Sequence, residues 1–148
     1  MKNEPYPGKL AGNNQKEQIN WLFMTKPLQR FTISIGLEVV GHIQINQPSK
    51  ALAMHLKSLP NKAQGDQNVL HAELSRLFVS PKMRNQLLAT KLLQHAENYA
   101  RSINLRPVLE VSSYLSPAIN LYLKNGYHQV SSRASSLNND TLLIFTKE

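Results

Sequence analysis

The hydrophobic pattern changes its period once within residues 69–101, VLHAELSRLFVSPKMRNQLLATKLLQHAENYAR. The first part is apolar and β-branched as far as Val79, and it ends at Ser80-Pro81, which predicts a strand followed by a break. Beyond a short basic loop the apolar residues take up helical spacing. The segment therefore predicts a strand, a loop and a helix.

Apolar residues on the predicted strand move from even to odd positions part-way along it. The even-numbered set is Leu70, Ala72 and Leu74, and the odd-numbered set is Leu77 and Val79. A one-residue slip near Ser75-Arg76, of the kind that a β-bulge produces, accounts for the change. A strand buried on both faces is the alternative.

The predicted helix has one wide apolar face, which should pack on the core. The apolar positions are Leu88, Ala89, Leu92, Leu93, Ala96, Tyr99, Ala100 and Ile103. The polar positions that face away are Lys91, Gln94, Asn98 and Arg101.

Upstream of this segment the pattern predicts a hairpin and a helix. Residues 31–35 alternate as FTISI, residues 36–38 can turn, and residues 39–45 read VVGHIQI, which together predict a β-hairpin. Residues 51–59 have helical spacing, and the polar stretch 60–68 predicts a flexible loop.

Downstream, residues 108–111 predict a strand, and the order strand, helix, strand implies a parallel pair with a right-handed crossover. Ser116 as N-cap, Pro117 at the first helical position and Gly126 at the end predict a second helix. Two closing strands are predicted at residues 127–131 and 141–146.

The N-terminal residues have no clear period. Residues 1–18 are polar, with two prolines and two glycines, and predict a loose arm. Between residues 16 and 28 a short helix and a strand fit equally well. With 148 residues and 41% hydrophobic composition, residues 1–148 are predicted to form one domain.

Composition excludes several classes of protein. The sequence has no apolar run of membrane-spanning length and no basic-then-apolar leader, so we expect a cytoplasmic protein. It has no cysteine, which excludes disulfides, a thiol nucleophile and thiolate metal sites. Its five histidines lack ligand spacing, so no metal is predicted.

The loop after the first predicted strand has the character of an anion site. A strand that leads into a helix N-terminus presents unpaired backbone N–H groups, which suit a phosphate or pyrophosphate. Lys82 and Arg84 add positive charge there.

Two motifs resemble the GCN5-related N-acetyltransferase (GNAT) superfamily. Its signature is an acidic strand ending in Val-x-Pro, then Arg-x-x-Gly-x-Gly/Ala; here it stands as ELSRLFVSP and Arg84-Asn85-Gln86-Leu87-Leu88-Ala89. Its later motif, Asn-x-x-Ala-x-x-Leu-Tyr-x-x-x-Gly-Phe/Tyr, is matched by Ala118, Leu121, Tyr122, Gly126 and Tyr127. The resemblance covers about residues 31–147.

The resemblance implies an α/β fold whose sheet is mixed and mostly antiparallel, flanked by helices. Its central parallel pair, residues 69–79 and 107–112, should splay apart to admit a ligand. The first strand and helix pair of the family must then be compressed into about thirty residues.

The sequence departs from the family pattern at two positions. Leu87 replaces the first glycine, which lets backbone approach the pyrophosphate closely, and Leu115 replaces the asparagine. Leu87 lies off the apolar face, so either its side chain turns outward or acyl-CoA binding is weakened or lost. Placed in the first helical turn, Leu87→Gly should cost up to about 1 kcal/mol.

The resemblance also implies which residues bind acetyl-CoA. Backbone at Phe78 and Val79 would hold the pantetheine arm. The loop and helix start would hold the pyrophosphate, through Arg84, Asn85, Gln86, Leu87, Leu88, Ala89 and Thr90.

Two catalytic residues are implied. Tyr122 would protonate the leaving thiolate, and the alternative is a tyrosine that only packs on the sheet. Glu73 shares a strand face with His71, and either side chain could take the proton of the attacking amine, with Glu73 as the predicted base. A solvated pair at a strand edge is the alternative for Glu73, and a lone carboxylate such as Glu110 is as often paired with arginine.

The predicted function is acetyl transfer from acetyl-CoA to an amine of a small molecule or peptide by direct attack. The alternative is a non-catalytic GNAT-like module for CoA binding or assembly, motivated by Leu87 and Leu115. The net charge of +8 admits a nucleic-acid partner, but the charges are dispersed and a CoA pyrophosphate also favours a basic site. No membrane is implied, and a homodimer is left open.

Overall fold

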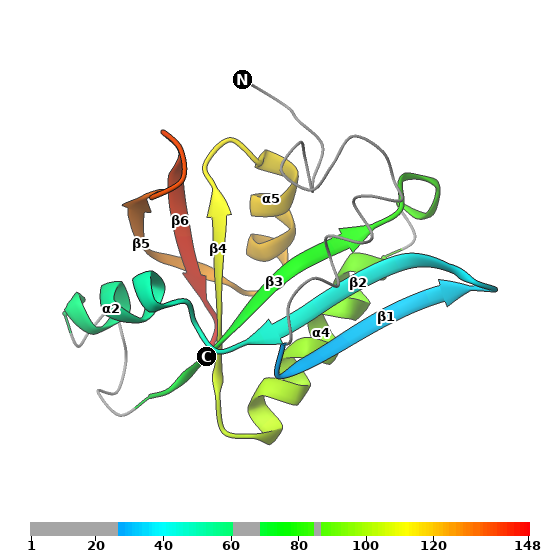
Figure 1. Cartoon of the computed structure of the whole chain (residues 1–148), viewed down its shortest axis with the longest axis horizontal. Helices are drawn as coiled ribbons and strands as arrows, with labels where there is room; N and C mark the ends of the chain where they lie inside the picture. The colour runs from blue at the N-terminus through cyan, green and yellow to red at the C-terminus, as the bar shows by residue number, and fades with distance from the viewer. Residues whose placement is uncertain (1–26, 61–68, 85–86) are drawn as a thin grey trace. The chain divides into compact units, whose positions relative to one another are not determined.

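The structure is a computed structural model of the chain, and it describes residues 27–60, 69–84 and 87–148. Its elements in chain order are β1 (Gln29–Ile35), β2 (Glu38–Asn46), α2 (Lys50–Ser58), β3 (His71–Val79), η2 (Pro81–Met83), α4 (Leu88–Ser102), β4 (Arg106–Ser112), α5 (Ser116–Lys124), β5 (His128–Ala134) and β6 (Thr141–Thr146), as Figure 1 shows. The predicted arm at 1–18 and the segment 61–68 lie outside the described residues, as does most of 16–28.

The strands form one sheet in the order β1-β2-β3-β4-β6-β5. The pairs β1–β2, β4–β6 and β5–β6 are antiparallel, and β3–β4 is parallel. This confirms the predicted fold class. The parallel ladder joins only His71–Glu73 to Arg106–Val108, although both strands continue beyond it.

The described residues group into two compact units. The first unit lies within residues 1–46 and 74–96, and the second within residues 47–73 and 97–148. Strand β3 and helix α4 each contribute residues to both units.

In the first unit, a hairpin packs on the first half of α4. The turn between β1 and β2 contains Gly36 in a left-handed conformation, with φ 61°. A Cβ at Gly41 would lie 3.1 Å from Leu92 Cδ1, so glycine on β2 permits the close approach of the helix. Leu92, Leu93 and Ala96 are buried, as the apolar face predicted.

In the second unit, helix α2 lies beside the β5–β6 pair (Figure 1). Leu52 and Leu56 form a buried cluster with Val108 of β4 and Ile144 of β6. The hydroxyl oxygen of Ser49 caps α2 by accepting a hydrogen bond from the Leu52 N–H at 3.1 Å. The predicted helix at 51–59 is therefore confirmed, and its apolar face supplies part of the core.

The C-terminal half of α4 differs from the prediction at Ile103, and it buries a carboxylate for which no position was predicted. Ile103, which was expected in the core, is 41% exposed because the helix ends at Ser102. Glu97 is buried on the apolar face, where the Nζ of Lys147 lies 3.0 Å from its carboxylate. A buried carboxylate needs a compensating partner, and the Lys147 ammonium group supplies one.

Strand β3 is irregular at the predicted place. Arg76 has a φ of 51°, an unusual value for a non-glycine residue in a strand, and we interpret it as the expected bulge. Beyond it Phe78 is buried at an even position, like Ala72 and Leu74, whereas the odd-numbered Leu77 and Val79 are half-buried. The predicted switch of burial to odd positions is therefore wrong, and the alternative of burial on both faces fits the end of the strand better.

The start of α5 also differs from the prediction. Its N-cap is Leu115, with Ser116 as the first helical residue, and no side chain caps the helix. Leucine has no acceptor for the free N–H groups of the first turn, whereas asparagine is a favoured N-cap. The departure at Leu115 therefore removes a helix cap.

Within the described residues, none of the helices combines the length and the apolar character needed to cross a membrane.

Candidate functional site

The end of β3 is tied to its surroundings through backbone groups. The N–H of Ser80 donates to the carbonyl of Val40 on β2 at 2.8 Å. The Nε of Arg84 donates to the carbonyl of Val79 at 3.0 Å. The first residue of the predicted pyrophosphate loop therefore contacts the last residue of the predicted pantetheine strand.

Leu87 adopts the conformation that glycine favours. Its φ is 60°, and its side chain is 72% exposed. Its carbonyl accepts from the Lys91 N–H at 3.1 Å, so Leu87 precedes α4 and does not belong to the first turn. Leu87 thus adopts a backbone conformation that glycine reaches without strain, and its side chain is turned toward solvent.

The start of α4, next to Leu87, presents backbone N–H groups that the helix itself does not pair. The first N–H groups of an α-helix, here those of Leu88, Ala89 and Thr90, have no partner within the helix. Asn85 and Gln86, the other predicted pyrophosphate residues, lie outside the described residues.

Leu87→Gly should therefore stabilise the protein by about 0.5–1 kcal/mol, because a left-handed leucine is strained and a left-handed glycine is not. This reverses the cost predicted from the sequence, which assumed a helical Leu87. The measurement is urea unfolding. Asn104→Gly is a matched control, since Asn104 has a φ of 61° but asparagine tolerates that region. A loss of stability in Leu87→Gly would contradict this account.

The positive charge of the loop is partly compensated. Lys82 forms an ion pair with Glu38 at the hairpin, and the side chains are 57% and 41% exposed. Such an exposed pair contributes little to stability, and solvent screens it.

Two side chains of β2 hold the irregular part of β3. The Nδ1 of His42 lies 2.8 Å from the carbonyl of Arg76, and the Nδ2 of Asn46 donates to the hydroxyl of Ser75 at 2.6 Å. Because a carbonyl only accepts, Nδ1 carries the proton. Burial lowers the pKa of His42, which favours the neutral ring in this place. The bulge is thus fixed from the neighbouring strand.

Tyr122 lies in the last turn of α5, and a glycine-dependent helix end fixes it. The N–H of Tyr127 donates to the Tyr122 carbonyl at 3.0 Å, and that of Gly126 donates to the Leu123 carbonyl at 3.2 Å. These two bonds form a Schellman motif, with Gly126 at φ 89° in the position that requires a positive φ.

The ring of Tyr122 is buried among other aromatic rings. Its centroid lies 6.1 Å from those of Tyr127 and Phe145, and the contact with Tyr127 is edge-on. Burial raises the pKa of Tyr122 to about 12. The hydroxyl therefore stays protonated at neutral pH and can serve as a hydrogen-bond donor.

Glu73 is half-buried near the start of β3. Its Oε1 accepts from the backbone N–H of Ser49 at 3.1 Å. Burial raises the pKa of Glu73, and the Ser49 N–H and the charge of Arg133 partly offset that rise, while the charge of Glu110 adds to it. Such a carboxylate can exchange a proton nearer to neutral pH than an exposed one.

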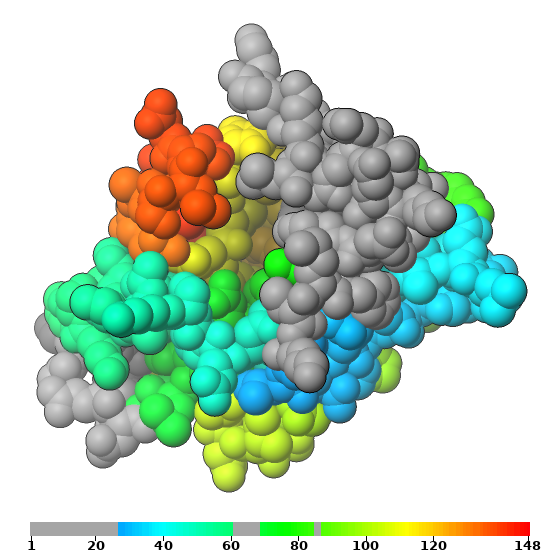
Figure 2. Space-filling model, in the orientation of Figure 1, coloured from blue at the N-terminus to red at the C-terminus, as the bar shows by residue number. Residues whose placement is uncertain are grey.

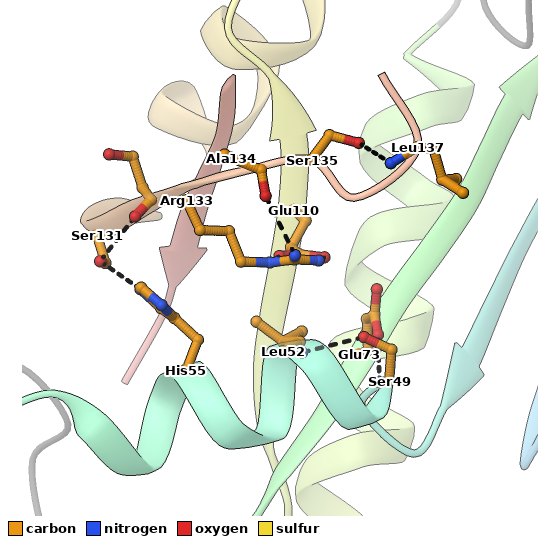
Figure 3. A network of polar contacts seen from close by, with 11 residues as sticks. Ser49, Leu52, His55, Glu73, Glu110, Ser131, Arg133, Ala134, Ser135 and Leu137 are labelled. Atoms are coloured by element: carbon orange, nitrogen blue, oxygen red, sulfur yellow. Dashed lines mark hydrogen bonds and ion pairs between the residues drawn. The ribbon is translucent and has the colours of Figure 1, made fainter. Parts of the chain in front are cut away.

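Glu110 is paired with arginine. Arg133 of β5 contacts it with Nε and, at 3.0 Å, with Nη2, so the pair is bidentate. Figure 3 shows this pair next to Glu73 and Ser49. Arg133 and Ser49 were not among the predicted site residues. The lone carboxylate of Glu110 in an otherwise apolar strand was the sequence signal for an arginine partner. No sequence pattern indicates a contact through the Ser49 backbone.

The predicted catalytic pair belongs to one unit. Glu73 and Tyr122 lie in the second unit, and the described part of the predicted CoA-binding set, from Phe78 to Thr90, lies in the first. Across the described residues, no group of three or more histidine, aspartate or glutamate side chains is placed to hold a metal ion.

Comparison with known proteins agrees with the fold. The model of the acetyltransferase (GNAT) family matches residues 2–127. No curated protein matches the sequence significantly. Among solved structures, the ribosomal-protein-S18-alanine N-acetyltransferase from Escherichia coli has a TM-score of 0.58 at 15% identity, over 88% of this chain and 75% of that protein.

Two further structures show the same likeness. A protein from Bacillus anthracis assigned as a streptothricin acetyltransferase, in complex with acetyl coenzyme A, has a TM-score of 0.60 at 14% identity, over 83% of this chain and 64% of that one. The NatC complex bound to Gag peptide and CoA has a TM-score of 0.56 at 19% identity, over 78% and 64%. At these identities the structures establish the fold, and the family match covers most of the chain. The chain belongs to the GNAT family of acetyltransferases.

Proposed function

We propose that this protein is an acetyl-CoA-dependent N-acetyltransferase in which an amine attacks the thioester directly. The conformation of Leu87 carries the proposal. The family pattern has glycine there, and Leu87 keeps a φ of 60° with its side chain 72% exposed. A module that had lost CoA binding through Leu87 would have that side chain in the loop, so its exposure favours a loop that still binds acetyl-CoA.

The segment from Phe78 to Thr90 would bind acetyl-CoA. The first N–H groups of α4, which have no partner within the helix, suit the pyrophosphate, and Arg84 adds positive charge to the loop. Phe78 and Val79 would hold the pantetheine arm through their backbone. The hydrogen bond from Arg84 to the Val79 carbonyl supports this assignment, because it holds the loop proposed for the pyrophosphate beside the strand end proposed for the pantetheine arm.

Glu73 and Tyr122 would supply the proton transfers. The amine nitrogen forms a bond to the thioester carbonyl carbon, and the carbon–sulfur bond breaks. Glu73 takes the proton of the attacking amine, directly or through water, and the Tyr122 hydroxyl donates to the leaving sulfur. The chain has no cysteine, so no protein thiol can carry the acetyl group, which supports direct attack.

The acceptor class that we propose is a primary amine of a small molecule or peptide, with the cytoplasm as the site of reaction. The net charge of +8 supports a second candidate, an amine carried by RNA. Binding to transfer RNA that weakens steeply with salt would favour the second candidate over the first.

Calorimetry with acetyl-CoA tests the proposal. We expect measurable binding, and copurified CoA should appear as a mass shift in native mass spectrometry. No binding at millimolar acetyl-CoA would end the proposal. Binding without turnover on a broad panel of amines would favour the non-catalytic module instead.

A further inference from the structure

Helix α2 and Glu73 together complete a capping arrangement that is usually local. In a capping box the N-cap side chain accepts from the N–H of the third helical residue, and the side chain of that residue accepts from the N-cap N–H. Ser49 makes the first bond, to the Leu52 N–H. Leu52 cannot make the second, because it has no acceptor.

Glu73 makes the second bond from another element. Its Oε1 accepts from the Ser49 N–H at 3.1 Å (Figure 3). Its Oε2 makes no hydrogen bond with any residue that the structure describes. The helix therefore fixes Oε1 of the carboxylate, and Oε2 remains available to accept a proton.

The helix is firmly held where it makes this contact. Leu52 and Leu56 are buried against β4 and β6, and the Nε2 of His55 lies 2.7 Å from the Ser131 hydroxyl on β5. Figure 2 shows α2 lying against the β5–β6 hairpin on this face. The Ser49 N–H is thus presented from a packed element.

We propose that α2 is a positioning element for Glu73, whose Ser49 N–H fixes Oε1 and leaves Oε2 to receive the proton of the attacking amine. The inference rests on the proposed function, because it takes Glu73 as the base. It assigns a role to the segment between β2 and β3, which otherwise interrupts the sheet.

The contact also sets the pH range in which the base is ionised. The charged groups that act on Glu73 are Glu110 from β4 and Arg133 from β5, and the dipole that acts on it from α2 is the Ser49 N–H. The N–H stabilises the carboxylate, so it lowers the pKa of Glu73, and its removal must raise that pKa. The acid limb of the rate profile should then move to higher pH.

The test compares two substitutions at one position. Ser49 has a φ of −55°, which proline accepts, so Ser49→Pro removes the N–H without forcing the backbone. Ser49→Ala keeps the N–H and removes only the hydroxyl cap. The difference between the two variants isolates the bond to Glu73, and circular dichroism checks that both are folded.

The readouts are the Glu73 carboxyl titration by ¹³C NMR and the pH dependence of kcat/KM with an accepted amine. In Ser49→Pro both midpoints should move up, and kcat/KM on the acid limb should fall about tenfold; in Ser49→Ala neither midpoint should move. An unmoved carboxyl titration in folded Ser49→Pro would overturn the inference. If the Glu73 carboxyl titration moved but the acid limb of kcat/KM did not, Glu73 would not be the base and α2 would have no catalytic role. Acetyl-CoA binding, measured separately by calorimetry, would be unaffected by that result.

A measurement on the parent protein covers the case in which Ser49→Pro does not fold. The amide proton shift of Ser49 should titrate with the midpoint of the Glu73 carboxyl, and Glu73→Gln should abolish that titration. A Ser49 amide that does not respond to pH across the Glu73 midpoint would overturn the inference without any variant.

Discussion

Tyr122→Phe should lower kcat about a hundredfold and leave the affinity for acetyl-CoA within a factor of two, since proton donation in the transition state typically contributes such a factor. The ring keeps its contacts with Tyr127 and Phe145, so the change removes only the hydroxyl. The pKa of about 12 keeps that hydroxyl protonated through the neutral range. The measurement is steady-state kinetics at neutral pH with an accepted amine.

Tyr127→Phe is the matched control, because it makes the same change in the ring that contacts Tyr122. The backbone N–H of Tyr127, which closes the helix end, is kept. We expect kcat to change less than threefold. Equal losses in the two variants would mean that the aromatic packing matters and that the Tyr122 hydroxyl does not act on the sulfur.

Arg133→Met should destabilise the protein by about 3 kcal/mol, because it leaves the Glu110 carboxylate with no partner in a poorly hydrated place. The side chains of Arg133 and Glu110 are only 17% and 10% exposed. For a chain of this length the melting temperature should fall by roughly 10 °C. Thermal unfolding followed by circular dichroism is the measurement.

Two comparisons separate the lost pair from other effects. Lys82→Met breaks the ion pair with Glu38, whose side chains are 57% and 41% exposed, and should cost less than about 1 kcal/mol. Combining Arg133→Met with Glu110→Leu should recover most of the loss, since no charge is then left buried. If Arg133→Met and Lys82→Met were equally destabilised, burial of the ion pair between Arg133 and Glu110 would not explain the loss of stability.

The loss of Arg133 should also raise the pKa of Glu73. The positive charge of Arg133 holds the pKa of Glu73 down, against burial and against Glu110. Without it, the carboxylate is protonated at a higher pH. The arginine therefore supports both the stability of the second unit and the ionised state of the proposed base.

The strands and helices of the described residues could be predicted from the sequence because local signals agreed with the packing. The alternating residues of β1, the helical spacing of α4 and the glycine after α5 each lie where the structure has the predicted element, whereas β2 is buried at every position from Val40 to Ile45. Ile103 was misplaced because the apolar spacing continues past Ser102, where the helix ends. Ser116 was misplaced by one residue, since a good N-cap side chain stands next to the position that caps.

Contacts between elements could not be predicted in the same way. Leu87 was expected to be helical because its neighbours have helical spacing, and spacing carries no information about a positive φ. The bond from the Ser49 backbone to Glu73 involves no side chain of Ser49, so residue types cannot indicate it. The ties from His42 and Asn46 to the bulge depend on the register of two strands, which only the folded chain defines.

The helix end at Gly126 has a consequence for natural variation. The Tyr127 N–H donates to the Tyr122 carbonyl across the turn at Gly126. The orientation of Tyr122, the proposed acid, therefore depends on a glycine. Any other residue at φ 89° would strain the turn and shift the phenol. A natural variant substituted at Gly126 would then be inactive although it keeps every proposed catalytic residue.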